Sequence, residues 1–167
     1  MNVRLLSAAI NNGSFNPNAT YSNANGIKVD DVEINDWSIN EGISTGRTMT
    51  FAQGFSYSSN VVMTMLEQEM GDKVWSNYLS LFKFGLPTRF GMFGESSGVV
   101  SRNSVNIAQS SFGQGISVTQ VQMLRAFTAI SNNGIMLEPQ FIKQVADVNQ
   151  GTARTAKTEV IGKPVSK

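Results

Sequence analysis

The chain has 167 residues, of which 41% are hydrophobic and 15% are charged, and its net charge is +1. These values are typical of one globular domain with a hydrophobic core, and a nearly neutral chain gives no support for binding nucleic acid. Because histidine and cysteine are absent, Ser-His-Asp and Cys-His catalysis, disulfides and nearly all zinc chemistry are excluded, and we predict no cofactor or metal.

The first element predicted is a helix over residues 2–12, with Val3, Leu6 and Ile10 on one stripe. An Asn-Asn-Gly sequence follows and is typical of a left-handed C-terminal cap. The segment resembles a signal peptide only superficially, since its apolar part is short and ends in this cap. No cap precedes the helix, so we expect that the chain is part of something longer.

Residues 13–48 are rich in Asn, Gly, Ser and Asp, which predicts loops and short strands, with either a small hairpin or edge strands over residues 27–34. Trp37 is the one tryptophan in this polar region. A lid over the local core is the favoured interpretation of this tryptophan, and the wall of a substrate cleft is the alternative.

Three helices are predicted next. Thr50 is a suitable N-cap for a short helix that runs to about Tyr57, Ser58-Ser59-Asn60 leads into a second helix that Gly71 ends, and Asp72 caps a third. The inward positions of the second helix are Val61, Val62, Met65, Leu66 and Met70. The two apolar stripes of the third are Val74, Tyr78 and Leu81, and beside them Trp75, Leu79 and Phe82.

Residues 86–116 are predicted to be a second loop region, in which Gln114 stands between two glycines. A capping box over residues 117–120 opens the clearest helix of the chain. We expect this helix to be central in the core, and Arg125 in it to bind a buried carboxylate or loop carbonyls. Its two apolar stripes are Met123, Phe127 and Ile130, and Val121 with Leu124. Strands are predicted over residues 135–137 and 139–145, followed by a polar tail without a helical pattern.

The Ser-Ser-Asn triplet at residues 58–60 carries the main functional hypothesis. Two hydroxyls and an amide at the start of a helix can simply cap it, or they can move a proton and hold a substrate beside a reacting acyl group. Ser-x-Asn is one of three motifs of penicillin-recognising serine enzymes. The triplet alone decides nothing, because Ser-x-Asn occurs six times in the chain.

Two near matches to the other motifs are discarded. Ser80 and Lys83 form a Ser-x-x-Lys at the end of a predicted helix, where the dipole disfavours a nucleophilic serine. Lys157-Thr158-Glu159 has a side chain where the Lys-Thr-Gly motif needs glycine.

The whole chain resembles the transpeptidase domain of class B penicillin-binding proteins, the enzymes of division-type peptidoglycan cross-linking. The matching segments are, in chain order, Asp36-Trp37, Asn40 to Gly42, Thr50 to Phe55, Ser58 to Asn60, Leu66 to Gln68, Phe82 to Gly85, Pro87 to Gly91, Asn106 to Gln120, Arg125 to Ile130 and Gly162 to Lys167.

This resemblance implies an α+β fold: the mostly helical central part of a penicillin-binding, serine β-lactamase-like transpeptidase domain, with small β elements and an incomplete sheet. It implies that residues 1–167 are a partial domain, cut at both ends, whose core helix exposes apolar surface. It implies that Ser58 and Asn60 are catalytic, and that Trp37, Ser59 and Gln114 bind substrate.

The same resemblance implies a D,D-transpeptidase that acts on peptidoglycan stem peptides and is acylated by β-lactams, anchored on the extracytoplasmic face of the plasma membrane and part of a division complex. By the same resemblance Asn2 stands at the lysine of the Ser-x-x-Lys motif, and the nucleophilic serine would fall ahead of Met1. The Lys-Ser/Thr-Gly motif would fall beyond Lys167, so we expect the segment alone to be inactive. A serine β-lactamase or carboxypeptidase, and a non-catalytic wall-binding or scaffold module, are the alternatives.

Overall fold

The computed structural model describes residues 2–167, and the chain divides into two units. One contains the residues up to Tyr78 together with Val100–Ser117, and the other contains Leu79–Val99 and Val118–Lys167. The helix α5 (Asp72–Leu81) and the strand β5 (Val99–Val100) lie where the chain passes between them. Helices alternate with two-stranded sheets in the described part, so the predicted α+β class is confirmed.

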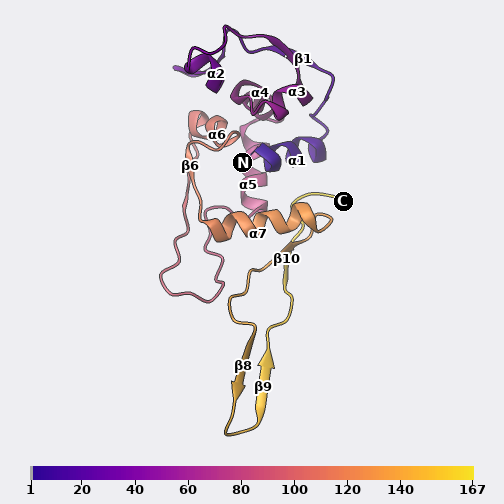
Figure 1. The fold of residues 1–167 in the computed structure, drawn as a ribbon, viewed down its shortest axis with the longest axis vertical. Helices are drawn as coiled ribbons and strands as arrows, with labels where there is room; N and C mark the ends of the chain where they lie inside the picture. The colour runs from indigo at the N-terminus through magenta and orange to yellow at the C-terminus, as the bar shows by residue number, and fades with distance from the viewer. Residues whose placement is uncertain (1) are drawn as a thin grey trace. The chain divides into compact units, whose positions relative to one another are not determined.

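The first unit is built from short strands and from helices of four to eleven residues (Figure 1). Its strands are β1 (Thr20–Ser22), β2 (Ile27–Val29), β3 (Val32–Ile34), β4 (Thr48–Thr50) and β6 (Ile116–Ser117), and its helices are α1 (Asn2–Asn12), α2 (Trp37–Asn40), α3 (Phe51–Ser56), α4 (Asn60–Met70) and α6 (Ser104–Ser110). β1 pairs with β4 and β2 with β3, both antiparallel.

The helix α4 forms the centre of this unit. Val61, Val62, Met63 and Leu66 are at most 1% exposed, and α1 packs against the helix. The predicted inward residues of α4 are buried except Met65, which is half-buried. This burial on nearly all sides explains why the apolar pattern of α4 is broad rather than a single stripe.

The predicted face of α1 is wrong, although its extent is confirmed. The buried side consists of Arg4, Leu5, Ala8 and Ala9, whereas Val3 is 38% and Ile10 58% exposed. This buried side carries two alanines, whose small side chains let helices approach closely, and α1 packs against α4. Apolar spacing alone does not identify that side.

Gly71 ends α4 as predicted, with a φ of +86°. Its carbonyl accepts the N–H groups of Val74 and Trp75, so Gly71 and not the predicted Asp72 stands at the N-cap of α5. Asp72 lies in the first turn, where its charge favours the helix dipole. Of the two predicted stripes of α5, the one with Trp75 and Leu79 is buried.

The predicted hairpin over residues 27–34 is confirmed, with Val29 opposite Val32 across a two-residue turn. It packs through Val29 and Ile34 against Ala108 of α6. That helix was not predicted, because residues 86–116 were assigned to loops. It begins where the Asn103 side chain accepts the Asn106 N–H, a cap that forms in a stretch with too few apolar residues to show a helical period.

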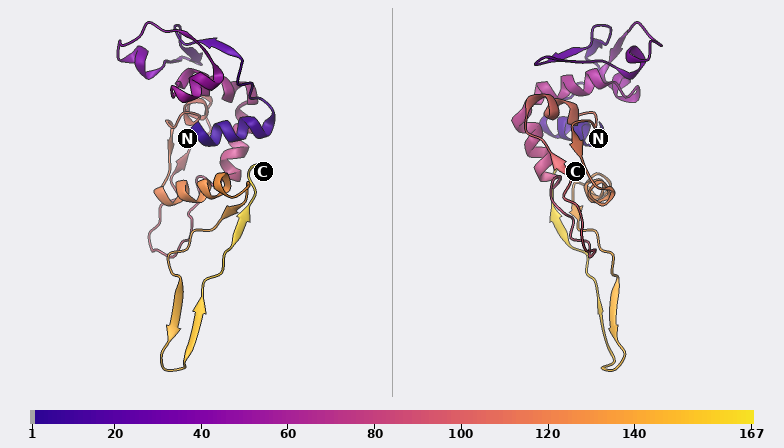
Figure 2. Two further views of the ribbon diagram at one scale, coloured as in Figure 1. Left: turned by 45° about the vertical axis from the view of Figure 1, so that its right-hand side comes forward. Right: turned by 90° about the vertical axis from the view of Figure 1, so that its left-hand side faces the viewer.

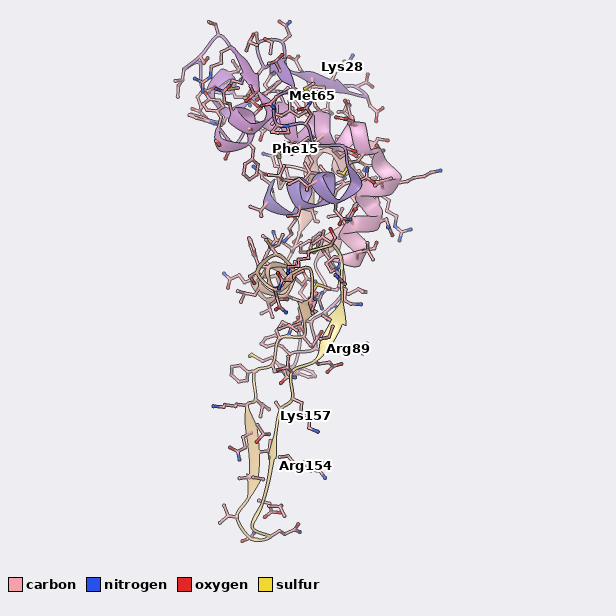
Figure 3. All side chains as sticks on the ribbon, turned by 90° about the vertical axis from the view of Figure 1, so that its right-hand side faces the viewer. Phe15, Lys28, Met65, Arg89, Arg154 and Lys157 are labelled. Atoms are coloured by element: carbon pink, nitrogen blue, oxygen red, sulfur yellow. The ribbon has the colours of Figure 1, made fainter. Side chains whose placement is uncertain are left out.

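The second unit contains α7 (Gln120–Ser131), the paired strands β7 (Met136–Leu137) and β10 (Val160–Gly162), and the hairpin of β8 (Gln144–Asp147) and β9 (Thr152–Thr155). Predicted strand 139–145 is thus mostly loop, and the tail forms two strands that were not predicted. The hairpin extends away from α7 in both views of Figure 2. Arg154 of β9 and Lys157, which follows the strand, project into solvent (Figure 3).

The capping box of α7 lies two residues later than predicted. The Thr119 hydroxyl accepts the Gln122 N–H and the Gln122 side chain accepts the Thr119 N–H. The sequence allows the motif in both registers, and Ser117 lies in a strand. The two predicted apolar stripes do not form the buried face of α7, since Leu124 is 65% and Phe127 42% exposed. This exposure agrees with the expectation that the helix presents apolar surface in this segment.

The buried face of α7 is Gln122, Arg125, Ala126 and Ala129. Its polar members bind the preceding loop. Gln122 donates to the carbonyls of Leu86 and Ser97, both at 2.8 Å. Arg125 donates to three carbonyls, those of Lys83, Leu86 and Pro87, so the predicted binding of loop carbonyls by Arg125 is confirmed.

Candidate active site

The Ser-Ser-Asn turn joins two helices with a single residue between them. Tyr57 is the C-cap of α3 and Ser59 is the N-cap of α4, which leaves Ser58 alone in the middle. The Ser58 N–H donates to the Phe55 carbonyl at 3.0 Å and the Ser59 N–H to the Gly54 carbonyl at 2.9 Å. These two bonds form a Schellman motif, and Ser58 occupies its left-handed position with a φ of +57°.

The helix before the turn is held at its start and at its middle. A capping box between Thr50 and Gln53 fixes the first turn. Tyr21 of β1 covers Gly54, where an added Cβ would lie 2.4 Å from the tyrosine Oη. Burial raises the pKa of Tyr21 to about 12, so this hydroxyl stays protonated at neutral pH and is not a base.

A buried carboxylate holds the start of the helix after the turn. Asp36 is fully buried, and its Oδ1 accepts the Ser59 hydroxyl at 2.8 Å and the Val61 N–H at 3.0 Å. The other oxygen, Oδ2, accepts the Asn23 amide at 2.5 Å. Ser59 in turn accepts the Val62 N–H at 3.2 Å. A negative charge at this end also complements the dipole of α4.

The residues on both sides of Asp36 contact the same turn. Asn35 offers its carbonyl to the Asn60 side-chain amide at 3.0 Å, and the Trp37 indole N–H donates to the Tyr57 carbonyl at 3.3 Å. Three consecutive residues therefore bind the turn, and among residues 2–167 no hydrogen-bond partner of the Ser58 hydroxyl is found. Ser58 is exposed, so its hydroxyl is presented to solvent from a rigid support.

The contact with Asn35 orients the amide of Asn60. A carbonyl can only accept, so the Asn60 NH₂ group must face it. This leaves the Asn60 Oδ1 and one N–H for other partners. Asn60 is half-buried, and its amide can pair with both the N–H and the C=O of a peptide group.

Trp37 is not the buried lid that was the favoured interpretation, because its side chain is 45% exposed. Its ring lies against Tyr57 with centroids 5.6 Å apart, and the Arg47 guanidinium covers the same tyrosine at 4.3 Å. The tryptophan thus lies on the surface against Tyr57, the residue that precedes Ser58 in the chain. A cleft-wall role for Trp37 remains a prediction.

The position of Ser59 does not agree with the predicted contact between this residue and substrate. It is fully buried and its hydroxyl is engaged with Asp36 and with the Val62 N–H. The structure gives it the role of a helix cap. The sequence does not distinguish the two serines, since either can cap; the left-handed geometry at Ser58 places the second serine inward.

Gln114 is exposed in the turn between α6 and β6. The turn is tight, because Gly113 and Gly115 have positive φ values and a Cβ on Gly115 would lie 2.9 Å from the Asn106 carbonyl oxygen. Within the described chain, the Gln114 side chain makes no hydrogen bond to the Ser58–Asn60 turn. Its predicted role in substrate binding remains a prediction.

A pocket of about 560 Å³ runs along α3, lined among others by Arg47, Gln53 and Tyr57. It contains none of the predicted site residues and meets the site only through Tyr57. In residues 2–167 no group of three acidic side chains converges to hold a metal ion. No helix in that range is both long and apolar enough to cross a membrane.

Sequence reasoning missed Asp36 and Asn23 as parts of the site. Asp36 appeared only as half of an Asp-Trp match, and Asn23 lies in a stretch rich in asparagine. The contacts of Asp36 span 13 to 25 residues of sequence. No local pattern indicates such contacts, although an acid directly before the matched tryptophan was the available signal.

Comparison with known proteins identifies the family. The model of the family described as "Penicillin binding protein transpeptidase domain" matches residues 3–167. Penicillin-binding protein PbpB of Mycolicibacterium smegmatis is 32% identical over 141 residues, which cover 81% of this chain and 21% of that protein. Stage V sporulation protein D of Bacillus subtilis is 30% identical over 127 residues, or 71% of this chain and 20% of that protein.

Solved structures agree. Penicillin-binding protein 2X from Streptococcus thermophilus is 90% identical, with a TM-score of 0.97 over 99% of this chain and 24% of that one. Penicillin-binding protein 3 of Mycobacterium tuberculosis, complexed with ampicillin, is 28% identical with a TM-score of 0.85, and the match covers 99% of this chain and 36% of that one. The chain spans about a fifth of the length of these curated relatives. Their shared sequence and fold confirm the resemblance drawn from the motifs, and the chain belongs to the penicillin-binding protein transpeptidase family.

Proposed function

We propose that the protein containing this segment is a peptidoglycan D,D-transpeptidase, which cross-links stem peptides through a serine acyl-enzyme and is acylated by β-lactams. The observation that carries this proposal is the exposed Ser58 hydroxyl, presented beside the oriented Asn60 amide in a chain of this family. A relative with the same fold has been solved with ampicillin. The segment forms part of the transpeptidase domain.

Ser58 moves a proton in this proposal. A hydroxyl both donates and accepts. Ser58 can therefore accept the proton that the attacking serine releases and pass a proton to the leaving amine. Within the described chain its hydroxyl has no competing partner, and it is fixed by the backbone bonds of the turn. Proton transfer by a positioned group contributes about 10²–10⁴-fold to rate. No residue of this segment is proposed as the nucleophile.

Asn60 holds the substrate amide through the groups that Asn35 leaves unpaired. Trp37 borders the cleft on the side of Tyr57, and its exposed ring offers an apolar wall to a stem peptide or to a β-lactam side chain. Gln114, exposed between two glycines, borders the cleft at the turn after α6. These roles follow the family's pattern.

Hydrolysis is less well supported. A β-lactamase needs a carboxylate that activates the deacylating water. Asp36 is the carboxylate that contacts this turn, but it is buried and both of its oxygens accept hydrogen bonds from protein groups. The proposed acyl acceptor is therefore an amine of a neighbouring stem peptide. We also propose that the whole protein is membrane-anchored, acts outside the plasma membrane and takes part in a division complex.

Intact-mass spectrometry of the full-length protein after benzylpenicillin treatment tests the function. A stable adduct supports the transpeptidase, a rapidly hydrolysed adduct indicates a β-lactamase, and no adduct indicates a scaffold. Ser58→Ala is expected to slow adduct formation by about 10²–10⁴-fold. Ser56→Ala is the matched control, because Ser56 is exposed and its hydroxyl donates to the Ala52 carbonyl of its own helix. The segment alone should form no adduct.

A further inference from the structure

Asp36 stands at the N-cap of α2 but does not cap that helix. The side chain of an aspartate at this position normally accepts an N–H from the first turn of its own helix, and the Asp36 carboxylate forms no such bond. The carboxylate instead reaches Ser59 and Val61 at the start of α4, 23 and 25 residues away in sequence. The carboxylate therefore stabilises the start of α4, next to the Ser58–Asn60 turn, rather than its own helix.

All three partners of this carboxylate are donors. Asn23 cannot turn its amide round, because its Oδ1 already accepts the Arg47 N–H at 2.8 Å, so its NH₂ group faces Asp36. Ser59 and Val61 supply the other two donors. The site therefore suits an acceptor with two oxygens. An amide in place of Asp36 would turn its NH₂ group toward the NH₂ group of Asn23, so that two donors would face each other.

We propose that Asp36 is a positioning residue for the Ser58–Asn60 turn. By holding Ser59 and the Val61 N–H it fixes the start of α4, and the backbone bonds of the Schellman motif then keep Ser58 in its left-handed conformation with the hydroxyl outward. Asp36 touches no reacting atom. This inference rests on the proposed proton transfer by Ser58.

The test is the acylation of the full-length protein by benzylpenicillin, resolved into the non-covalent dissociation constant and the first-order acylation rate. Asp36→Asn is expected to lower the acylation rate by about 10²-fold, the effect of misplacing a reacting group by about 1 Å. The dissociation constant should change much less. Asp31→Asn, in the exposed hairpin turn, is the control and should change neither value.

A reciprocal exchange tests whether the hydrogen-bond pattern around position 36 sets the acylation rate. In the double variant Asn23→Asp with Asp36→Asn, the new carboxylate accepts the Arg47 N–H and the new amide, while the amide oxygen at position 36 accepts from Ser59 and Val61. Every hydrogen bond is restored with the charge moved, so the acylation rate should recover most of its loss. Thermal unfolding of both variants separates the two causes, because a single variant that is fully folded at the assay temperature and still acylates slowly has lost positioning rather than stability.

Two results overturn the proposal: a folded Asp36→Asn protein with the wild-type acylation rate, and a folded double variant that stays as slow as the single one. If Asp36→Asn does not fold, Asn23→Ala removes the orienting bond and keeps the charge. A slower acylation rate in Asn23→Ala then supports the proposal, and an unchanged rate overturns it. Failure of the wild-type protein to be acylated at all would instead reject the transpeptidase function.

Discussion

Replacing Ser58 by glycine should stabilise the protein while it removes activity. Ser58 has a φ of +57°, a conformation that costs an L-residue roughly 1–2 kcal/mol because its Cβ crowds the backbone. Glycine avoids this cost but loses about 0.4–1 kcal/mol through the greater entropy of its unfolded chain. The balance predicts a Ser58→Gly variant more stable by about 0.5–1 kcal/mol.

Ser58→Ala is the matched variant, because it removes the hydroxyl and keeps the Cβ. Thermal unfolding of the two full-length variants should therefore place the glycine variant above the alanine variant. Benzylpenicillin acylation should be slowed in both by about 10²–10⁴-fold. A glycine variant no more stable than the alanine variant would refute the reasoning from backbone strain. An active glycine variant would refute the role of the hydroxyl.

Three further predictions concern stability. Glu67 is buried with Oε1 unpaired among the described residues, and burial, aided by a nearby acid, raises its pKa from 4.5 to about 7. The folded state then binds the extra proton, so the free energy of unfolding should fall by about 3.5 kcal/mol as pH rises from 4.5 through 7, at about 1.4 kcal/mol per pKa unit. Glu67→Gln should remove this dependence in thermal melts. Arg125→Met strips three loop carbonyls of their donor and should cost about 2–4 kcal/mol, seen as faster proteolysis of that loop. Gly134→Ala brings a Cβ to 2.1 Å from a backbone carbonyl oxygen at a φ of +84°, and should cost about 2–4 kcal/mol in denaturant unfolding.

Each of these has a control or a contrary result. Glu69→Gln, two residues from Glu67 and exposed, should leave the pH dependence intact, and a pH-independent wild-type protein would contradict the role given to Glu67. Gly151 has a φ of +64° in open space, so Gly151→Ala should cost only about 1 kcal/mol. Equal costs at Gly134 and Gly151 would contradict the steric argument. Loop proteolysis unchanged by Arg125→Met would mean that the carbonyls find other donors.

Local features were predictable from the sequence. The Thr50 cap, the start of α4 at the Ser-Ser-Asn turn and the hairpin at residues 27–34 depend on neighbours in the chain, and all three are confirmed. The binding of loop carbonyls by Arg125 was also predicted, since a charged residue within an apolar helix needs partners.

The faces of the helices and the support of the site were not predictable. The buried sides of α1 and α7 include Arg4 and Arg125, because contacts from distant segments decide which side is covered. α6 depends on one asparagine cap and on a hairpin far earlier in the chain. The carboxylate of Asp36 acts over 25 residues. Only the folded chain shows that Ser58 faces outward and Ser59 inward.

The β8–β9 hairpin is a suitable place for a tag or a label. Its residues are exposed on both strands and at the tip, where Gly151 has free space around it. Exposed loop tips tolerate insertions well, so an epitope tag after Gln150 should leave the helices of the segment undisturbed. Since the sequence contains no cysteine, Gln150→Cys would introduce the only thiol of these 167 residues and give a unique attachment point for a fluorophore.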